Sequence, residues 1–455
     1  MLLRFTVENL CCFADEIEFS MVASKDDQHP AHSMILREGY KHKALRVAAL
    51  YGANGHGKTK LVEAMSIARN LVIRGRRPGQ SIPVTPFRLD EAKRSQPSRF
   101  EFVIFQEGME YTYGFVANSK RILEELLFAR PKSHEVRYFE RVTDVQSSTK
   151  VEFGPTLKRW EKDEQFLEFV SRGTRENQLF LTEAMERNME SVKPVYQWFR
   201  DVLTLVPTNL PMQPIEIRAC QEVSFTEFMG DFLCLADTGI NGVVTEEEEL
   251  DYKRHLPGMP EVLRQRLEDD LAKQEVVWMI GGEEKPSFAI RSGKDGPTVI
   301  RLKTQHKDQQ GQPVLFNIEE ESSGTQRVMQ ILPILADIKT GNRVYVIDEL
   351  DRKLHPLLSR LFVETFLEQS KANNSQLIFT THETSLLNMD LLRRDETWFV
   401  EKDTGGVSHL YSLSSLKVRP DLKIERGYLQ GRFGAIPFIG DTRALGWSAS
   451  DSPWP

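Results

Sequence analysis

The chain has 455 residues, of which 40% are hydrophobic and 27% charged, and its formal net charge is −7. This size and balance are ordinary for a globular protein, and they allow one large core or a few smaller ones. The absence of any run of about 18 apolar residues predicts no membrane-spanning helix. The negative charge excludes an overall polybasic nucleic-acid binder, although a local basic face stays open.

The N-terminal segment and the cysteines indicate a cytoplasmic protein. MLLRFTVENLCCF lacks a basic region followed by a long apolar stretch and a cleavage site, so it predicts a strand and not a signal peptide. The cysteines form no CxxC pair and no Cys/His zinc pattern. We interpret them as reduced thiols. They are Cys11, Cys12, Cys220 and Cys234.

The first 130 residues predict strands on both sides of a glycine-rich loop. LRFTVENL and DEIEFSMV alternate like paired strands, and the apolar run Arg46–Tyr51 predicts a buried strand. Apolar residues at helical spacing between Leu61 and Leu71 predict a helix after the loop. Phe100–Phe105 and Tyr111–Val116 predict a hairpin around Glu107-Gly108.

From about 131 to 285 the sequence is charged and predicts a mostly helical insertion. The expected helices are Asp163–Val170, Thr182–Met189, Ser191–Leu205 and Glu261–Glu275. The acidic run Glu246–Glu249 indicates a solvated face or a loop. Sustained heptads are missing, which excludes a long coiled-coil arm.

From about 286 strands return and alternate with helices. SFAIRS, TVIRLK and VLFNIE predict strands, and further elements are expected at Thr325–Lys339 (helix), Val344–Ile347 (strand), Pro356–Gln369 (helix) and Gln376–Thr381 (strand). This order predicts an α/β fold with a mainly parallel sheet covered on both faces. We therefore expect one nucleotide domain split into lobes 1–130 and 286–455 by the insertion 131–285.

The loop at 52–59 matches G-x-x-x-x-G-K-[ST], the pattern of a phosphate-binding loop. Its glycines let backbone N–H groups surround phosphate oxygens, and the helix that follows points its N-terminus at them. A glycine-rich turn without ligand is the alternative, which the flanking strand and helix disfavour. The expected ATP-binding residues are Gly52, Asn54, Gly55, Gly57, Lys58 (on the β/γ-phosphates) and Thr59 (also on Mg²⁺).

Four apolar residues, Val344–Ile347, lead directly into Asp348 and Glu349. A buried strand that ends in two carboxylates places them at the carboxyl edge of the sheet, where α/β folds bind ligands. Because side chains alternate along a strand, Asp348 is expected to reach Mg²⁺ while Glu349 faces the attacking water as general base. The alternative is an acidic pair at a helix start, and the phosphate-binding loop favours the catalytic interpretation.

Two further motifs, one before and one after Asp348-Glu349, lie where they can contribute to the same ATP chemistry. Ser322-Ser323-Gly324-Thr325-Gln326-Arg327 opens a helix and forms either an anion-binding end or an ordinary helix cap. His382 follows the strand QLIFTT, where it is either a catalytic residue that contacts γ-phosphate or the attacking water, or a surface residue. The spacing to Asp348 favours the functional interpretation of both.

Together these motifs resemble the ABC-type ATPase heads of the SMC, Rad50, RecF and OLD group. The resemblance is nearer to the bacterial AAA15-type ATPases, including RloA- and AbiL-like proteins, through GANGHGKT, PFRLD, ESSGTQR, VIDELDRKLHP and YLQGRFGAIPFI. S-S-G-T-Q at 322–326 is similar to the signature motif of that group, in which two heads enclose two ATPs and the signature of one head meets the ATP held by the other. The resemblance therefore implies that Ser323, Gly324 and Gln326 act across a homodimer or a larger oligomer. His56 departs from the usual GANGAGKS, and a histidine there is expected beside the phosphates.

The resemblance also implies a biological role. It suggests the sensor or regulatory ATPase of an anti-phage (abortive infection) system, which gates a separate effector, such as a nuclease, encoded nearby. The alternative is a DNA-repair-like ATPase that holds nucleic acid between its heads, with Arg74, Arg76 and Arg77 as a basic cluster. A metabolic kinase is a third hypothesis, which the signature weighs against. The tract Gly427–Ile439 is either a docking tail or a packed terminus, and Gln106 is not expected to act as a Q-loop.

Overall fold

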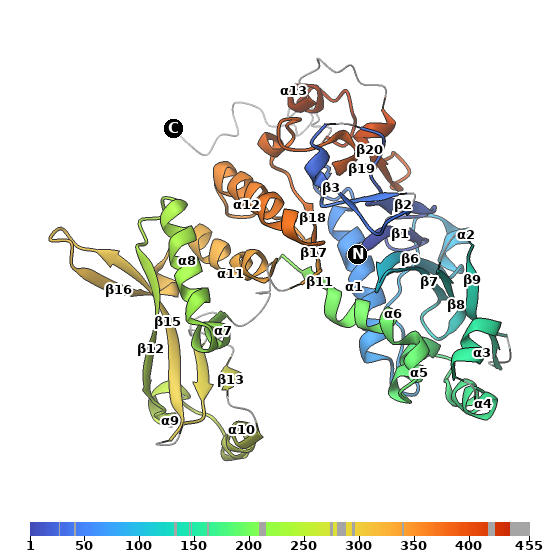
Figure 1. Ribbon diagram of the computed structural model, residues 1–455, viewed down its shortest axis with the longest axis horizontal. Coiled ribbons are helices and arrows are strands. Elements are labelled where there is room, and N and C mark those ends of the chain that lie inside the picture. Colours follow the sequence, from blue (N-terminus) through green and yellow to red (C-terminus); the bar gives the residue numbers. More distant parts are fainter. Residues whose placement is uncertain are drawn as a thin grey trace, which may run out of the picture.

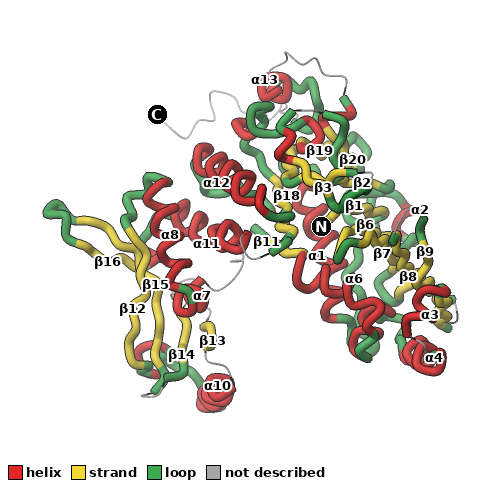
Figure 2. The backbone as a smooth tube through the Cα atoms, viewed as in Figure 1, coloured by secondary structure: helices red, strands yellow, loops and turns green. Residues whose placement is uncertain are grey.

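The computed structural model describes residues 1–455 except 27, 41, 132–133, 145, 147, 162, 209–214, 274–275, 280–287, 294–295, 339–340, 417–423 and 437–455. A parallel sheet and an antiparallel sheet lie on one side of the molecule, and an accessory sheet stands apart on the other (Figure 1). Helices cover and connect the sheets (Figure 2). Within the described ranges, no helix combines the length and apolarity needed to cross a membrane.

The parallel sheet has the strand order β11-β17-β18-β5-β19-β20, and only the pairing of β20 with β19 is antiparallel. This confirms the α/β fold that the sequence predicts. Its strands are β5 (Val47–Tyr51), β11 (Leu203–Val206), β17 (Val344–Ile347), β18 (Gln376–Thr380), β19 (Thr397–Lys402) and β20 (Ser408–Ser412).

The two faces of this sheet build two hydrophobic cores, because successive side chains of a strand point to opposite faces. Ala48 and Leu50 belong to the core shared with helix α1 (Lys58–Arg74) and the antiparallel sheet. Ala49 and Tyr51 belong to the core shared with α11 (Ser323–Asp337) and other helices. Burial on both faces explains the uninterrupted apolar sequence of β5 and β17.

The antiparallel sheet has the order β10-β9-β8-β7-β6-β1-β2. It contains the two predicted hairpins of the N-terminal region, β1 with β2 and β6 with β7. Its strands are β1 (Leu2–Glu8), β2 (Ile17–Ser20), β6 (Ser98–Gln106), β7 (Met109–Ala117), β8 (Ile122–Arg130), β9 (Val136–Thr143) and β10 (Thr149–Phe153), and beside it β3 (Ser33–Ile35) pairs with β4 (Lys43–Leu45).

The accessory sheet has the order β12-β15-β14-β13, with β16 also paired to β15. Helix α8 (Val223–Leu235) packs on β12, and α11 contacts α8, so α11 joins this sheet to the rest of the molecule. The strands are β12 (Gly242–Glu249), β13 (Val276–Met279), β14 (Phe288–Arg291), β15 (Thr298–Lys307) and β16 (Pro313–Asn317).

The described part of 131–285 contains more helix than strand, as the sequence predicts, but several of its strands pair with strands outside the stretch. This stretch contributes β9 and β10 to the antiparallel sheet, β11 to the parallel sheet, and β12 and β13 to the accessory sheet. The predicted helix Ser191–Leu205 ends in a π-helical turn at Trp198–Val202, and β11 follows it. Strand pairing does not break at 130 or 285, and the three-part division of the chain stays a prediction.

The remaining helices support the sheets. The expected helix at Pro356–Gln369 is α12 with the same bounds. The others are α2 (Glu91–Arg94), α3 (Pro155–Glu161), α4 (Glu164–Gly173), α5 (Phe180–Glu186), α6 (Lys193–Gln197), α7 (Ile215–Gln221), α8 (Val223–Leu235), α9 (Tyr252–His255), α10 (Glu261–Lys273) and α13 (Ile424–Leu429).

The described part of the C-terminal tract packs against the parallel sheet. The Tyr428 ring stacks on Phe399 at 5.6 Å between centroids, and its hydroxyl donates to Ala435 O at 3.0 Å. Phe433 also stacks on Phe399. These contacts favour a packed terminus over a docking tail for residues up to 436; residues 437–439 of the tract lie outside the described part.

Candidate functional site

The glycine-rich loop connects β5 to α1 at the carboxyl edge of the parallel sheet. A Cβ atom on Gly57, which has φ 117°, would lie 2.8 Å from Cys12 Sγ, and one on Gly52 would lie 2.5 Å from Val400 O. Glycine is therefore required at both positions. Gly57 caps α1 without a side-chain hydrogen bond, so no side chain competes for the first N–H groups of the helix.

Lys58 lies almost wholly buried at the start of α1. Its Nζ donates to Gly52 O at 2.6 Å and to Ala53 O at 3.3 Å, which holds the ammonium inside the loop. Burial lowers the pKa of Lys58 to about 8, and Asp348 is the carboxylate that opposes this shift most. The lysine therefore presents a poorly solvated positive charge, which favours a polyanionic ligand.

Asp348 follows β17 and is held by three hydroxyls. Thr59 Oγ1 and Thr380 Oγ1 donate to its Oδ1 at 3.2 and 2.7 Å, and Thr208 Oγ1 donates to its Oδ2 at 2.7 Å. Hydroxyl and carboxylate oxygens are ligands that Mg²⁺ prefers, and Mg²⁺ commonly uses one or two protein ligands together with phosphates and water. Thr59 and Asp348 thus fit the predicted metal role.

Glu349 lines the same cavity but takes another direction. Its backbone has φ 51°, in the left-handed region, and its N–H donates to Thr380 Oγ1 at 2.7 Å. A non-glycine residue in this conformation costs on the order of 1 kcal/mol. Thr380 Oγ1 therefore bonds both to the Asp348 carboxylate and to the Glu349 backbone N–H, and so fixes the position of the two acids relative to each other.

His382 follows β18 and faces Lys58. Its Nδ1 lies 3.5 Å from Lys58 Nζ, and its backbone N–H lies 3.3 Å from both carboxylate oxygens of Asp351. Burial and then the charge of Lys58 lower the pKa of His382, so the ring is neutral at pH 7. A neutral ring beside an ammonium can offer a nitrogen as an acceptor.

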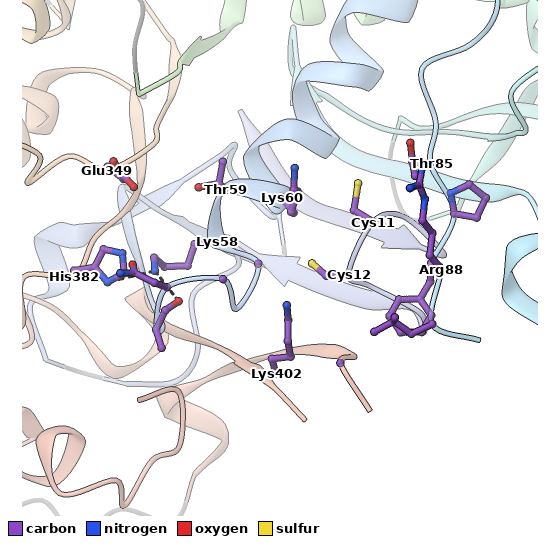
Figure 3. A pocket seen from close by; sticks show the side chains of 18 residues that line it. Cys11, Cys12, Lys58, Thr59, Lys60, Thr85, Arg88, Glu349, His382 and Lys402 are labelled. Atoms are coloured by element: carbon purple, nitrogen blue, oxygen red, sulfur yellow. Dashed lines mark hydrogen bonds between the residues drawn. The ribbon is translucent and has the colours of Figure 1, made fainter. Parts of the chain in front are cut away.

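These residues meet at one end of a cavity of about 420 Å³. Figure 3 shows Lys58, Thr59, Glu349 and His382 grouped there, while Cys11, Cys12, Thr85, Arg88 and Lys402 line the other end. Gly55, Gly57 and Asn54 also line it, and Gly52 lies behind the loop as the acceptor for Lys58.

Several residues of this site were missed by the sequence reasoning. Thr208 and Thr380, which hold Asp348, and Asp351, which holds the His382 backbone, carried no assignment. The second aspartate of D-E-L-D was a usable signal for Asp351. Cys11 and Cys12 reach the cavity through the β1–β2 turn, which no local pattern indicates.

The signature residues do not join this cavity. Ser322 Oγ accepts the Thr325 N–H at 3.1 Å and caps α11, while Ser323 is exposed. A Cβ on Gly324 would lie 2.7 Å from Lys353 O, which explains the glycine. Gln326 Nε2 donates to Glu321 O at 2.9 Å. Within one chain, Ser323, Gly324 and Gln326 are absent from the described lining of the cavity.

The signature loop is tied to the accessory sheet through Glu321. Its Oε1 accepts His306 Nε2 at 2.7 Å and also accepts the Thr304 hydroxyl, and both donors lie on β15. The Glu321 carbonyl oxygen in turn accepts a hydrogen bond from Gln326 Nε2. We call Thr304, His306 and Glu321 the signature latch, since it fixes the start of α11 to β15.

Two minor expectations have definite outcomes. His56 was expected beside the phosphates, but it is absent from the described lining of the cavity, and its carbonyl accepts Ser408 Oγ at 2.6 Å. Gln106 lies at the end of β6 in the hairpin, as expected, and does not line the described cavity.

Comparisons with known proteins agree with the nucleotide-binding geometry. The profile of the family described as "AAA domain, putative AbiEii toxin, Type IV TA system" matches residues 47–153 and 246–388, more than half of the chain. The first range holds the glycine-rich loop, and the second holds Asp348, Glu349 and His382. A search of curated proteins finds no match.

SMC heads are among the solved structures to which the chain has a distant similarity. The SMC head domain from Thermotoga maritima has 13% identity over 92% of this chain and 99% of that chain, with a TM-score of 0.38. The SmcHead bound to the C-winged helix domain of ScpA gives the same values. A Smc head with an extended coiled coil, bound to the C-terminal domain of ScpA derived from Pyrococcus furiosus, has 12% identity, coverages of 90% and 96%, and a TM-score of 0.35.

Proposed function

This chain belongs to that AAA-domain family, and from this premise we propose that it is a Mg²⁺-dependent ATPase whose active form is a head-to-tail dimer. One observation carries the proposal: Lys58, Thr59, Glu349 and His382 converge at one end of a single cavity, beside a buried Asp348. The AAA15-type resemblance stays a prediction within this family.

Each residue has a role that its contacts support. Lys58 and the free N–H groups of α1 bind the phosphates, and Thr59 with Asp348 holds Mg²⁺, which would neutralise charge on the transferred phosphoryl group. Glu349 accepts the proton of the attacking water as general base. His382, kept neutral by burial and by Lys58, orients that water or the terminal phosphate as an acceptor or donor.

The far end of the cavity suits the nucleoside. It is formed by the β1–β2 turn and by residues 85–89, and it supplies Arg88 and Lys402 as cations beside the apolar surface of Phe87. The base and ribose are proposed to lie there, with Cys11 and Cys12 facing them.

The proposed dimer is inferred from residues that are absent from the described lining of the cavity. The P-loop end has no described lining residue from the signature, although Ser323 lies exposed at a helix start that has an anion-binding character. We propose that Ser323, Gly324 and Gln326 complete the site of a second copy. A symmetric pair would then contain two composite sites.

In the cell, the proposed role is that of a sensor or regulatory ATPase in anti-phage defence, located in the cytoplasm, which gates a separate effector encoded nearby. The family description, which names a toxin of a toxin–antitoxin system, supports a defence context. The alternative is a repair-like ATPase that holds nucleic acid between its heads. Strongly salt-dependent DNA affinity would favour this alternative.

The decisive experiment uses Glu349→Gln. We expect this variant to bind Mg-ATP but to lose hydrolysis by roughly 10²–10⁴-fold, the usual contribution of a general base. Its mass in solution should double with Mg-ATP. The control is Glu364→Gln, an exposed glutamate of α12 that pairs with Arg360 away from the cavity, and it should hydrolyse normally.

Three results would count against the proposal. Unchanged hydrolysis by Glu349→Gln would remove its role as base, and an ATP-insensitive monomer would remove the dimer. Expression beside the genomic neighbours should yield a second protein that copurifies with the ATP-bound form, and its absence would contradict the gating role.

A further inference from the structure

A second cavity, of about 750 Å³, lies at the opposite end of α1 from the glycine-rich loop. Four short segments and Thr149 of β10 form it; the segments are 78–81 after α1, 119–120 in the β7–β8 turn, 171–172 at the end of α4, and 174–177 before α5. Since α1 has 17 residues, its two ends are about 25 Å apart at 1.5 Å per residue. This distal cavity is therefore separate from the nucleotide site.

The distal cavity is rimmed by positive charge in a protein whose net charge is negative. Lys120, Arg172 and Arg175 line it, and Glu176 is the acidic residue among its described lining. Arg172 pairs with Glu168, but neither Lys120 nor Arg175 has an ion pair in the described part of the chain. Arg175 Nη2 donates one hydrogen bond, to Arg76 O at 2.9 Å, and an excess of positive charge around a hollow is what a phosphate-bearing ligand needs.

The walls of the cavity are held in place before any ligand arrives. Asn177 is buried, and its Nδ2 donates to Arg77 O at 2.8 Å and to Gln80 O at 3.0 Å. Arg76 N–H donates to Gln178 Oε1 at 2.8 Å, and a Cβ on Gly75 would collide with that glutamine. The loop after α1 is thus fixed to the segment before α5, which reduces the entropic cost of binding.

Hydroxyl groups complete the lining. Ser81, Ser119 and Ser171 offer donors for phosphate oxygens between the cations. The cations surround a compact hollow, whereas a nucleic-acid strand needs an extended positive groove. We propose that the distal cavity binds a phosphate-bearing small ligand of nucleotide size, at a site distinct from that of ATP.

The test uses full-length protein with Lys58→Ala, so that the P-loop does not compete, and calorimetric titration with pyrophosphate and with AMP. We expect binding that Lys120→Glu weakens by on the order of tenfold, because the charge at the rim is reversed. Lys120 is exposed, so this variant should fold. A second variant, Lys120→Glu with Arg175→Gln, should abolish binding.

Lys253→Glu is the matched control, because Lys253 is an exposed lysine of α9 in the accessory part of the molecule. It should bind both probes as the parent does. Equal binding by the parent and both distal variants, or none by the parent, would overturn the proposal. A short single-stranded oligonucleotide that binds more tightly than AMP would replace the small ligand by nucleic acid and would also overturn it.

Discussion

The two surfaces proposed to meet ATP, the P-loop face and the signature face, are built differently. On the P-loop face, Lys58 and Asp348 are almost fully buried, and hydrogen bonds hold both without ligand. On the signature face, Ser323 is exposed, and the helix cap, the signature latch and the Gln326 side chain hold the loop around it. The P-loop face is therefore arranged to bind ATP by itself, whereas the signature face is proposed to contact ATP only when a second copy of the chain brings it there.

The largest expected effect concerns the P-loop face. Lys58→Ala should weaken Mg-ATP binding roughly 100-fold, which corresponds to about 3 kcal/mol, because it removes a buried charge that faces the phosphates. Lys60→Ala is the control: Lys60 also lines the cavity, but it is half exposed and pairs with Glu63. Equal losses of Mg-ATP affinity in the two variants would show that the buried ammonium of Lys58 has no special role.

A mixing experiment tests whether the two faces belong to different copies. Lys58→Ala and Ser323→Glu should each be inactive alone, whereas an equal mixture should recover about a quarter of the wild-type rate. The reason is that half of randomly mixed dimers are heterodimers, and each of them contains one intact composite site out of two. If the mixture stays inactive, the faces do not combine across copies.

The signature latch is expected to have a moderate effect on turnover only. Glu321→Ala should lower kcat about tenfold, since misplacing a positioning contact commonly costs this much or more, and should leave KM for ATP nearly unchanged. Glu321→Gln keeps an acceptor for Thr304 and His306 and should recover much of the rate. The control is Glu319→Ala, which changes an exposed neighbour. A parallel rise in KM would contradict a role confined to the signature face.

The smallest effect is a pH dependence of nucleotide binding. Burial lowers the pKa of Lys58 to about 8, so the charged form is complete at pH 7 and is lost as the pH rises through 8. Affinity for Mg-ATP should therefore fall about fourfold between pH 7 and pH 8.5. In Lys58→Arg, whose side chain does not titrate in this range, the profile should be flat.

The sequence predicted the P-loop face more completely than the rest. The loop at 52–59, Asp348, Glu349 and His382 lie in local patterns with a chemical meaning, and the structure brings them together. Thr208 could not be found, because its contact with Asp348 spans 140 residues and no motif surrounds it. Contacts of this kind depend on the tertiary fold and not on local spacing.

In the accessory sheet, β14, β15 and β16 coincide with predicted strands, but β12 and β13 were missed for a related reason. The acidic run Glu246–Glu249 lies on β12, and its first three carboxylates pair with basic residues of β15 and β14, such as Lys303 at 3.2 Å from Glu246. Cross-strand ion pairs let a charged segment form a strand that its composition alone disfavours. The expectation of a solvated face was sound, but its place on a strand became visible only with the partner strand.

The order of strands in the parallel sheet also constrains how the chain is made. β5, which leads into the glycine-rich loop, pairs with β18 and β19, and Gln376 Nε2 donates to Leu45 O across 331 residues of chain. While the protein is being synthesised, β5 has neither neighbour until nearly the whole chain has left the ribosome. The apolar side chains of β5 stay without their neighbouring strands during that time, which favours slow folding and dependence on chaperones. A nascent chain truncated before 376 could therefore not form the nucleotide site, so that ATP binding would report that synthesis has passed this point.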